Sequence, residues 1–270
     1  MRRSLTYLTL VNLVFLTILS ASSFFDGIVG RIIYYAAFII PLLLGFLIRR
    51  LDKEEKLNPP RLSLDKEGAF LSLPLVIPTL ALVLLLSFLT SLLLSLFGAE
   101  NNTPDVSGNI FVALLLHALV PSLLEEGLFR YLPIAILSPY SRRTAVLASA
   151  LFFSLIHCNL FQMPYAFIAG IIFATVDIMT DSIWPSVLIH FVNNTASVFW
   201  LRYNSNEQFT TVYLVVIGVL TAISLIPVFV FRKKYAERLS YAFNNECKEK
   251  LSFSPFALAA VCILIALMSL

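Results

Sequence analysis

The sequence predicts an all-α protein, a polytopic transmembrane helix bundle of about eight or nine membrane helices around an intramembrane polar cavity. Hydrophobic residues make up 59% of its 270 residues and charged residues only 13%, against roughly 25% charged residues in soluble domains. The apolar residues form runs of the length that crosses a bilayer, about 17 to 25 residues. We therefore expect a single integral membrane domain over 1–270.

Nine apolar runs are candidate spans. The run that ends at His157 is short, and the third run is long enough to tilt or break near Pro74 and Pro78. The first run follows Arg2 and Arg3 and also has the pattern of a signal peptide, but we favour a retained helix. In chain order the runs cover 4–21, 28–48, 69–97, 109–129, 144–157, 164–180, 183–201, 210–231 and 254–270.

The basic residues predict the orientation of these spans. With nine spans, the basic loops 49–67 and 232–252 fall on the same side as the N-terminus and as Arg142 and Arg143, whereas the loops on the other side hold only Arg202. Since Lys and Arg concentrate in cytoplasmic loops, we expect a plasma-membrane protein with its N-terminus in the cytoplasm. The two basic loops would then contact membrane lipids, and the net charge of +3 gives no reason to expect nucleic acid.

Three of the spans carry ionisable or strongly polar residues at membrane depth. A charge at the bilayer centre costs roughly 2.5 to 3.5 kcal/mol on insertion scales, so such residues point to function. The first of these spans reads PSLLEEGLFR over 121–130. Glu126 and Arg130 are spaced so that the arginine can neutralise the acid. Glu125 points about 100° away from Glu126 and has no partner nearby in sequence, so it is a candidate general base.

The other two spans supply imidazole and amide groups. SLIHCN places His157 one helical turn after Phe153, and HFVNN places His190 and Asn194 on one helix face. An imidazole and a carboxamide directed at one point can bind a metal, hold a water or donate hydrogen bonds to an oxyanion. Any one of these residues alone could equally be structural. Three such spans together favour one shared functional site.

The remaining polar residues of the spans are interpreted as structural. His117 lies two turns before the acidic pair, and Asp177 lies near the end of its span, where a carboxylate can reach water. The three cysteines have neither metal nor disulfide spacing and are expected to be packing residues: Cys158, Cys247 and Cys262.

The ordered motifs resemble those of a known family. They are EExxxR at 125–130, FxxxH at 153–157 and HxxxN at 190–194, and together they are similar to the three motifs of the CPBP family. That family contains the type II CAAX prenyl endopeptidases and bacterial proteins linked to bacteriocin processing or self-immunity. The resemblance covers the segment 109–200, the expected catalytic core, and implies an all-helical intramembrane endopeptidase.

The resemblance also implies roles for the motif residues. Glu125 would activate the attacking water with help from His157. His190 and Asn194 would stabilise the oxyanion of the tetrahedral intermediate. The substrate would be a peptide or a membrane protein, prenylated or not. Hydrolysis within a bilayer further requires a cavity that opens to one face.

The sequence leaves the cofactor open, with a divalent metal such as zinc as one possibility. One Glu with two His resembles a catalytic zinc set of three protein ligands and a water. The ligands would be Glu125, His157 and His190, with Glu126 as the base. The chain has no HExxH pair, however, and a carboxylate with a histidine can activate water unaided. The resemblance implies that Glu126 and Arg130 would hold the helix and polarise the site.

Two other functions would use the same residues or the same fold. A proton-coupled transporter could use Glu125, His157 and His190 as a relay. Such a transporter would be supported by paired inverted repeats, which the sequence does not show. A non-catalytic membrane protein of the bacteriocin-immunity type would keep the fold without cleavage, but the complete motif set argues against it. The oligomeric state is not indicated.

Overall fold

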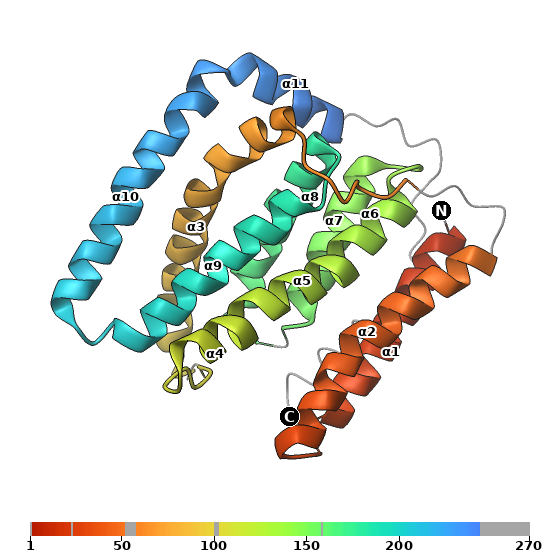
Figure 1. Cartoon of the computed structure of the whole chain (residues 1–270), viewed down its shortest axis with the longest axis horizontal. Coiled ribbons are helices and arrows are strands. Elements are labelled where there is room, and N and C mark those ends of the chain that lie inside the picture. The colour runs from red at the N-terminus through yellow and green to blue at the C-terminus, as the bar shows by residue number, and fades with distance from the viewer. Residues whose placement is uncertain (1, 23, 52–57, 100–102, 158, 244–270) are drawn as a thin grey trace.

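The computed structural model describes residues 2–22, 24–51, 58–99, 103–157 and 159–243, and its regular secondary structure in these ranges is helical. Within these ranges there is no strand, only an isolated bridge between Arg61 and Ser182. The helices lie side by side as a bundle (Figure 1), which confirms the predicted all-α class. The predicted span 254–270 and all three cysteines fall outside the described residues.

The helices follow one another with short connections. Their bounds are α1 (Arg2–Ser22), α2 (Gly27–Leu51), α3 (Lys66–Ser95), α4 (Ile110–Leu114), η1 (Leu115–Leu119), α5 (Val120–Glu126), η2 (Gly127–Tyr131), α6 (Leu132–Leu137), α7 (Arg142–Leu155), α8 (Met163–Thr180), α9 (Trp184–Tyr203), α10 (Glu207–Val230) and α11 (Arg232–Phe243). The elements from α4 to α6 form one continuous helix, in which η1 and η2 are π-helical turns.

Five helices of the described chain are long and apolar enough to cross a membrane, fewer than the eight or nine predicted. The predicted span 144–157 corresponds to α7, which has only 14 residues. The predicted span 183–201 corresponds to α9, whose polar residues lower its hydropathy. The five candidates are Gly27–Leu47, Lys66–Ser95, Ile110–Leu137, Met163–Thr180 and Glu207–Val230, and Thr6–Ser22 is a shorter apolar helix.

The connections between helices gather at two ends of the bundle (Figure 1). We call one the basic end, which comprises 58–65, the turns after α6 and α8, and α11. There Arg61 Nε lies 2.9 Å from Asp181 Oδ2, and Arg142 Nε donates a hydrogen bond to the Tyr241 carbonyl at 2.7 Å. These contacts join segments that are far apart in sequence into one surface.

We call the opposite end the distal end. It holds the connections from α1 to α2, α3 to α4, α7 to α8 and α9 to α10 (Figure 1). Arg202, in the last turn of α9, donates to the carbonyls of Gly108 at 2.8 Å and Val106 at 3.2 Å. The loop before α4 is thereby attached to the end of α9.

The α3 helix does not break at its prolines, contrary to one of the two outcomes predicted from Pro74 and Pro78. Because Pro74 has no N–H, the Phe70 carbonyl lacks its usual helical donor. The Tyr235 hydroxyl of α11 donates to this carbonyl at 3.4 Å and to that of Leu71 at 3.1 Å. The proline therefore creates an attachment point for α11.

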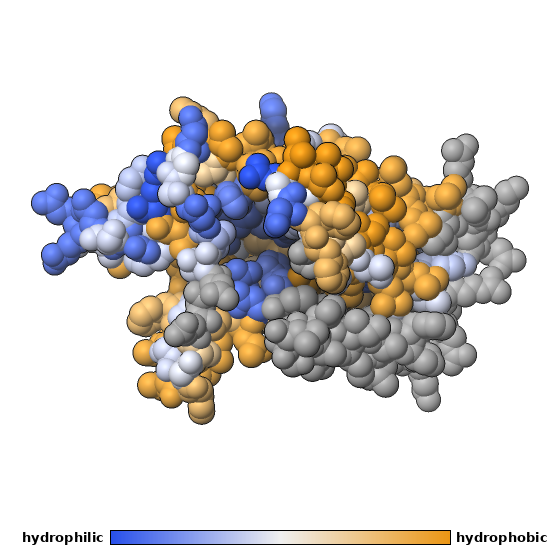
Figure 2. All heavy atoms as spheres, turned by 90° about the horizontal axis from the view of Figure 1, so that it is seen from below, coloured by the Kyte–Doolittle hydropathy of each residue, from blue (hydrophilic) through white to orange (hydrophobic). Residues whose placement is uncertain are grey.

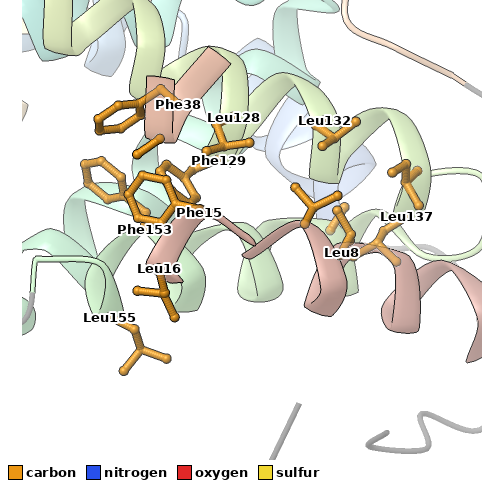
Figure 3. Packing of buried hydrophobic residues seen from close by; sticks show 14 of the residues in the cluster. Leu8, Phe15, Leu16, Phe38, Leu128, Phe129, Leu132, Leu137, Phe153 and Leu155 are labelled. Carbon is orange, nitrogen blue, oxygen red and sulfur yellow. The ribbon is translucent and has the colours of Figure 1, made fainter. Parts of the chain in front are cut away.

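An aromatic cluster attaches the α1–α2 pair to the continuous helix formed by α4 to α6, which we call the central helix. The Phe15 ring lies 4.9 Å from the Phe38 ring and 5.2 Å from the Phe129 ring, both edge to face. Figure 3 shows these side chains together with leucines of the same cluster. Edge-to-face pairs of buried rings add to the energy of burial, so this cluster fixes α1 and α2 beside the helix that carries the acidic motif.

Helices α7 and α8 approach closely at Gly170. A Cβ atom placed on this glycine would lie 2.9 Å from the Ala150 Cα. Small residues permit such backbone approach between membrane helices. This contact positions the end of α7, where His157 lies, relative to α8.

We expect Gly170→Ala to lower the free energy of unfolding by about 1 to 3 kcal/mol, because the added methyl group overpacks the contact with Ala150. Gly218→Ala is the matched control, since nothing lies within 4 Å of its Cβ position and alanine favours a helix by about 1 kcal/mol. Thermal unfolding in detergent measures both variants. Equal stability of the two would contradict the close packing of α7 on α8.

Candidate active site

Glu126 is fully buried and has partners from two helices. His190 Nδ1 on α9 donates to its Oε1 at 2.8 Å, and Arg130 Nε lies 3.4 Å from its Oε2. The second contact confirms the ion pair predicted from the EExxxR spacing. It is an ion pair rather than a hydrogen bond, because neither Arg130 Nε nor Glu126 Oε2 has a hydrogen-bond partner among the described residues.

The π-helical turns and two prolines shape the helix around this pair. Pro121 follows η1, and Pro133 follows η2; π-helical turns occur often at functional sites. Because Pro133 has no N–H, the Phe129 carbonyl lacks its helical donor. The Ser149 hydroxyl of α7 and the guanidinium of Arg130, at 3.2 Å, donate to it instead. Sequence reasoning missed Ser149, and the proline four residues after Phe129 was the signal for a free carbonyl.

Phe153, the aromatic residue of the FxxxH motif, separates Arg130 from the two histidines. The guanidinium carbon of Arg130 lies 4.1 Å from the centre of the Phe153 ring, a distance typical of a cation–π contact. The same ring lies 4.9 Å from the His157 ring and 5.5 Å from the His190 ring, edge to face in both cases. One phenyl ring therefore contacts all three motifs.

Asp177 is fully buried, so the prediction that its carboxylate can reach water is wrong. Its Oδ1 accepts the backbone N–H of Ser186, in the first turn of α9, at 3.0 Å. It is also close enough to Arg130 and Glu126 for charge–charge interaction. The chain turns sharply after α8, where Asp181 has a φ of 50°, and α9 then covers Asp177. The position of Asp177 along α8 could not indicate that α9 packs over it.

The hydrogen bond of His157 defines which of its nitrogens carries hydrogen. Nδ1 lies 2.8 Å from the Phe153 carbonyl oxygen. A carbonyl oxygen can only accept, so Nδ1 is the donor and Nε2 of the neutral ring is an acceptor. His157 can therefore accept a hydrogen bond through Nε2.

Glu125 faces away from Glu126, as the helical spacing predicts. Its Oε2 lies 3.8 Å from His190 Nε2, and 12% of its side chain is exposed, against none for Glu126. Glu125 therefore contacts His190, a residue of another helix. Local spacing in the sequence could not indicate this contact. His190 lies between the two glutamates, with one ring nitrogen toward each.

Four of the six predicted site residues line a single cavity of about 1220 Å³: Glu125, His157, His190 and Asn194. The other two, Glu126 and Arg130, have no exposed surface and lie behind the cavity wall. His117, which we expected to be structural, also lines the cavity.

The described side chains do not fit a metal ion. No group of three or more His, Cys, Asp or Glu residues in the described part of the chain could hold one, so the expected zinc set of Glu125, His157 and His190 is not assembled as ligands. The chemistry proposed below uses no metal.

Residues 107–196 match the family model of Type II CAAX prenyl endopeptidase Rce1-like proteins. The centre of this chain is similar to that family, and we call residues 107–196 the Rce1-like segment. The match confirms the predicted family resemblance, and the Rce1-like segment contains all three motifs. It begins just before α4 and ends within α9, so α1 to α3, α10 and α11 lie outside it. No curated protein and no solved structure matches the chain.

The family match and the apolar helices together indicate an integral membrane protein. The buried charges of the Rce1-like segment oppose separation of its helices. Separation of a pair would leave an unpaired charge in the interior, which is costly.

We expect Arg130→Met to destabilise the protein by about 3 to 5 kcal/mol, because it leaves Glu126 and Asp177 buried without their cation. Arg238→Met is the matched control. Arg238 pairs with Glu67 at 2.6 Å, but both side chains are more than 40% exposed, and exposed pairs contribute about 0 to 1 kcal/mol. Thermal unfolding in detergent compares the two variants. If Arg130→Met unfolds at the same temperature as Arg238→Met, the buried pair does not hold the helices.

Proposed function

We propose that this protein is an intramembrane endopeptidase that hydrolyses a peptide bond of a peptide or membrane protein with a water activated by Glu125. The observation that carries the proposal is the cavity that Glu125, His157, His190 and Asn194 line together. The Rce1-like match over the same helices supports the reaction class.

In the first step, Glu125 and His157 act on the attacking water. Glu125 is the acid that lines the cavity, and His157 Nε2 is a hydrogen-bond acceptor there. Glu125 takes a proton from the water as the water oxygen bonds to the carbonyl carbon of the peptide. His157 accepts the second hydrogen of the water in a hydrogen bond and so orients its lone pair.

The carbonyl oxygen of the peptide then carries a negative charge, which Asn194 and His190 stabilise. The carboxamide of Asn194 has two N–H donors, and His190 donates through Nε2 when both ring nitrogens carry hydrogen. In that form its Nδ1–H bonds to Glu126. Fixed donors of this kind supply much of the rate enhancement in acyl transfer.

The intermediate collapses as the C–N bond breaks. Glu125 returns its proton to the leaving nitrogen, which gives a carboxylic acid and an amine. Glu126 and Arg130 touch none of the reacting atoms. They are positioning residues, since Glu126 fixes the ring of His190 and Arg130 compensates the charge of Glu126.

We expect Glu125→Gln, His190→Ala and Asn194→Ala each to reduce cleavage by about 100-fold or more, because each removes the general base or an oxyanion donor. The measurement maps new peptide termini by mass spectrometry in membranes from cells that express each variant. Glu67→Gln is the matched control, because it neutralises an exposed acid at the basic end. The proposal fails if Glu125→Gln yields the same new termini as the wild type.

We expect cleavage by the purified protein in lipid vesicles to persist in EDTA and in 1,10-phenanthroline, because the described residues form no ligand group for a metal. The rate is compared before and after chelation. A loss of cleavage that added zinc restores would show that a metal takes part and would contradict this mechanism.

A further inference from the structure

Polar residues line one side of α9 along the cavity, and Asn204 follows at the end of the helix beyond Val198, Trp200 and Leu201. The stripe runs from His190 to Asn204, about 21 Å at 1.5 Å per residue. Its polar members recur every three, four or seven residues, so they lie along one side of the helix. We call this set the α9 stripe; its members, all of which line the cavity, are His190, Asn193, Asn194, Ser197 and Asn204.

The cavity opens at the distal end of the bundle. The described connections that contribute to its wall, 103–106 and 161–162, both belong to that end. No described residue of the basic-end connections or of α11 lines it. Seen from the distal end, hydrophilic residues surround a hollow between hydrophobic flanks (Figure 2). Asn204, at the exposed end of α9, lies at this opening.

The opposite end of the site is closed. Arg130, Asp177 and Ser186 lie between the cavity and the basic end, and all three are fully buried. The contact of Asp177 with the first turn of α9 joins α8 to α9 there. The proposed catalytic residues are therefore reached along the α9 stripe and not through the basic end.

The stripe contains a buried polar atom that lacks a partner. Asn193 is 8% exposed, and its Oδ1 has no hydrogen-bond partner among the residues described. An unsatisfied buried acceptor costs about 1 to 3 kcal/mol, so a donor that enters the cavity is stabilised there. A carboxamide both donates and accepts, which matches the N–H and C=O groups of an extended peptide.

The charge distribution indicates which side of the membrane the opening faces. The connections at the distal end contain no Lys or Arg and have Arg202 beside them in the last turn of α9. Arg61, Arg142, Arg143 and the basic residues of α11 lie at the basic end. Because Lys and Arg concentrate on the cytoplasmic side, the distal end faces away from the cytoplasm.

We propose that the α9 stripe binds the peptide segment of the substrate, which enters from the non-cytoplasmic side. The substrates are then membrane-anchored polypeptides whose cleaved bond lies near that surface. This inference rests on the proposed peptidase function. Entry from the non-cytoplasmic side excludes prenylated C-termini as substrates. A prenyl group is attached in the cytoplasm and holds the C-terminus at the cytoplasmic surface.

Cysteine labelling tests the direction of entry without any assay of cleavage. In a background with the three native cysteines replaced by serine, single cysteines are placed at Asn194, Ser197 and Asn204 and exposed to a membrane-impermeant maleimide. We expect all three to be labelled in intact cells. Val192→Cys is the control on the other side of α9, because Val192 packs against a core cluster, and it should stay unlabelled. Lys233→Cys, on exposed α11, should be labelled only after permeabilisation.

Labelling of the stripe cysteines only in inverted vesicles, or labelling of Val192→Cys equal to that of Ser197→Cys, would overturn the entry route. Either result leaves the peptidase proposal intact, since that depends on Glu125→Gln.

The location of the cleaved bonds tests the substrate class. In the terminus mapping described above, we expect the termini that are lost in Glu125→Gln to lie in non-cytoplasmic segments of membrane proteins. We also expect a farnesylated CAAX peptide added to the purified protein in vesicles to remain uncleaved. Glu125-dependent termini in cytoplasmic segments, or cleavage of the farnesylated peptide, would overturn this part of the inference.

Discussion

The arrangement of the central helices depends on one buried carboxylate, that of Glu126. It accepts a hydrogen bond from His190 at 2.8 Å and faces Arg130 at 3.4 Å. Arg130 in turn lies on the ring of Phe153, so the central helix, α7 and α9 meet at a single cluster of charges. An unpaired charge in this interior would cost several kcal/mol. Rotation or separation of any of these helices is therefore opposed, and Glu125 and His157 are held in place with them.

The adjacent glutamates show how environment gives two roles to one side-chain type. A helical turn of about 100° per residue directs Glu126 into the protein and Glu125 toward the cavity. The ring of His190 links them, with Nδ1 toward the buried acid and Nε2 toward the cavity acid. One acid can then act as a general base because the other one fixes the imidazole and is compensated by Arg130.

The features that follow from local spacing could be predicted from the sequence. The all-α class, the positions of most spans, the Glu126–Arg130 pair and the separate direction of Glu125 all depend on apolar runs and helical periodicity. The contacts of Asp177, Ser149 and His190 could not be predicted, because each depends on which helix packs against which. The count of eight or nine spans is not confirmed, because α7 is short and α9 is polar toward the cavity. In α9, hydropathy and function conflict in the same helix.

The central claim is that Glu125 activates a water and does not itself attack the peptide. Single-turnover cleavage in ¹⁸O-labelled water, with a substrate identified by terminus mapping, tests this most directly. The account predicts one ¹⁸O atom in the new carboxyl group from the first turnover and none in the peptide that contains Glu125. An unlabelled product carboxyl group together with ¹⁸O in Glu125 after the same single turnover would show a covalent intermediate and contradict the account.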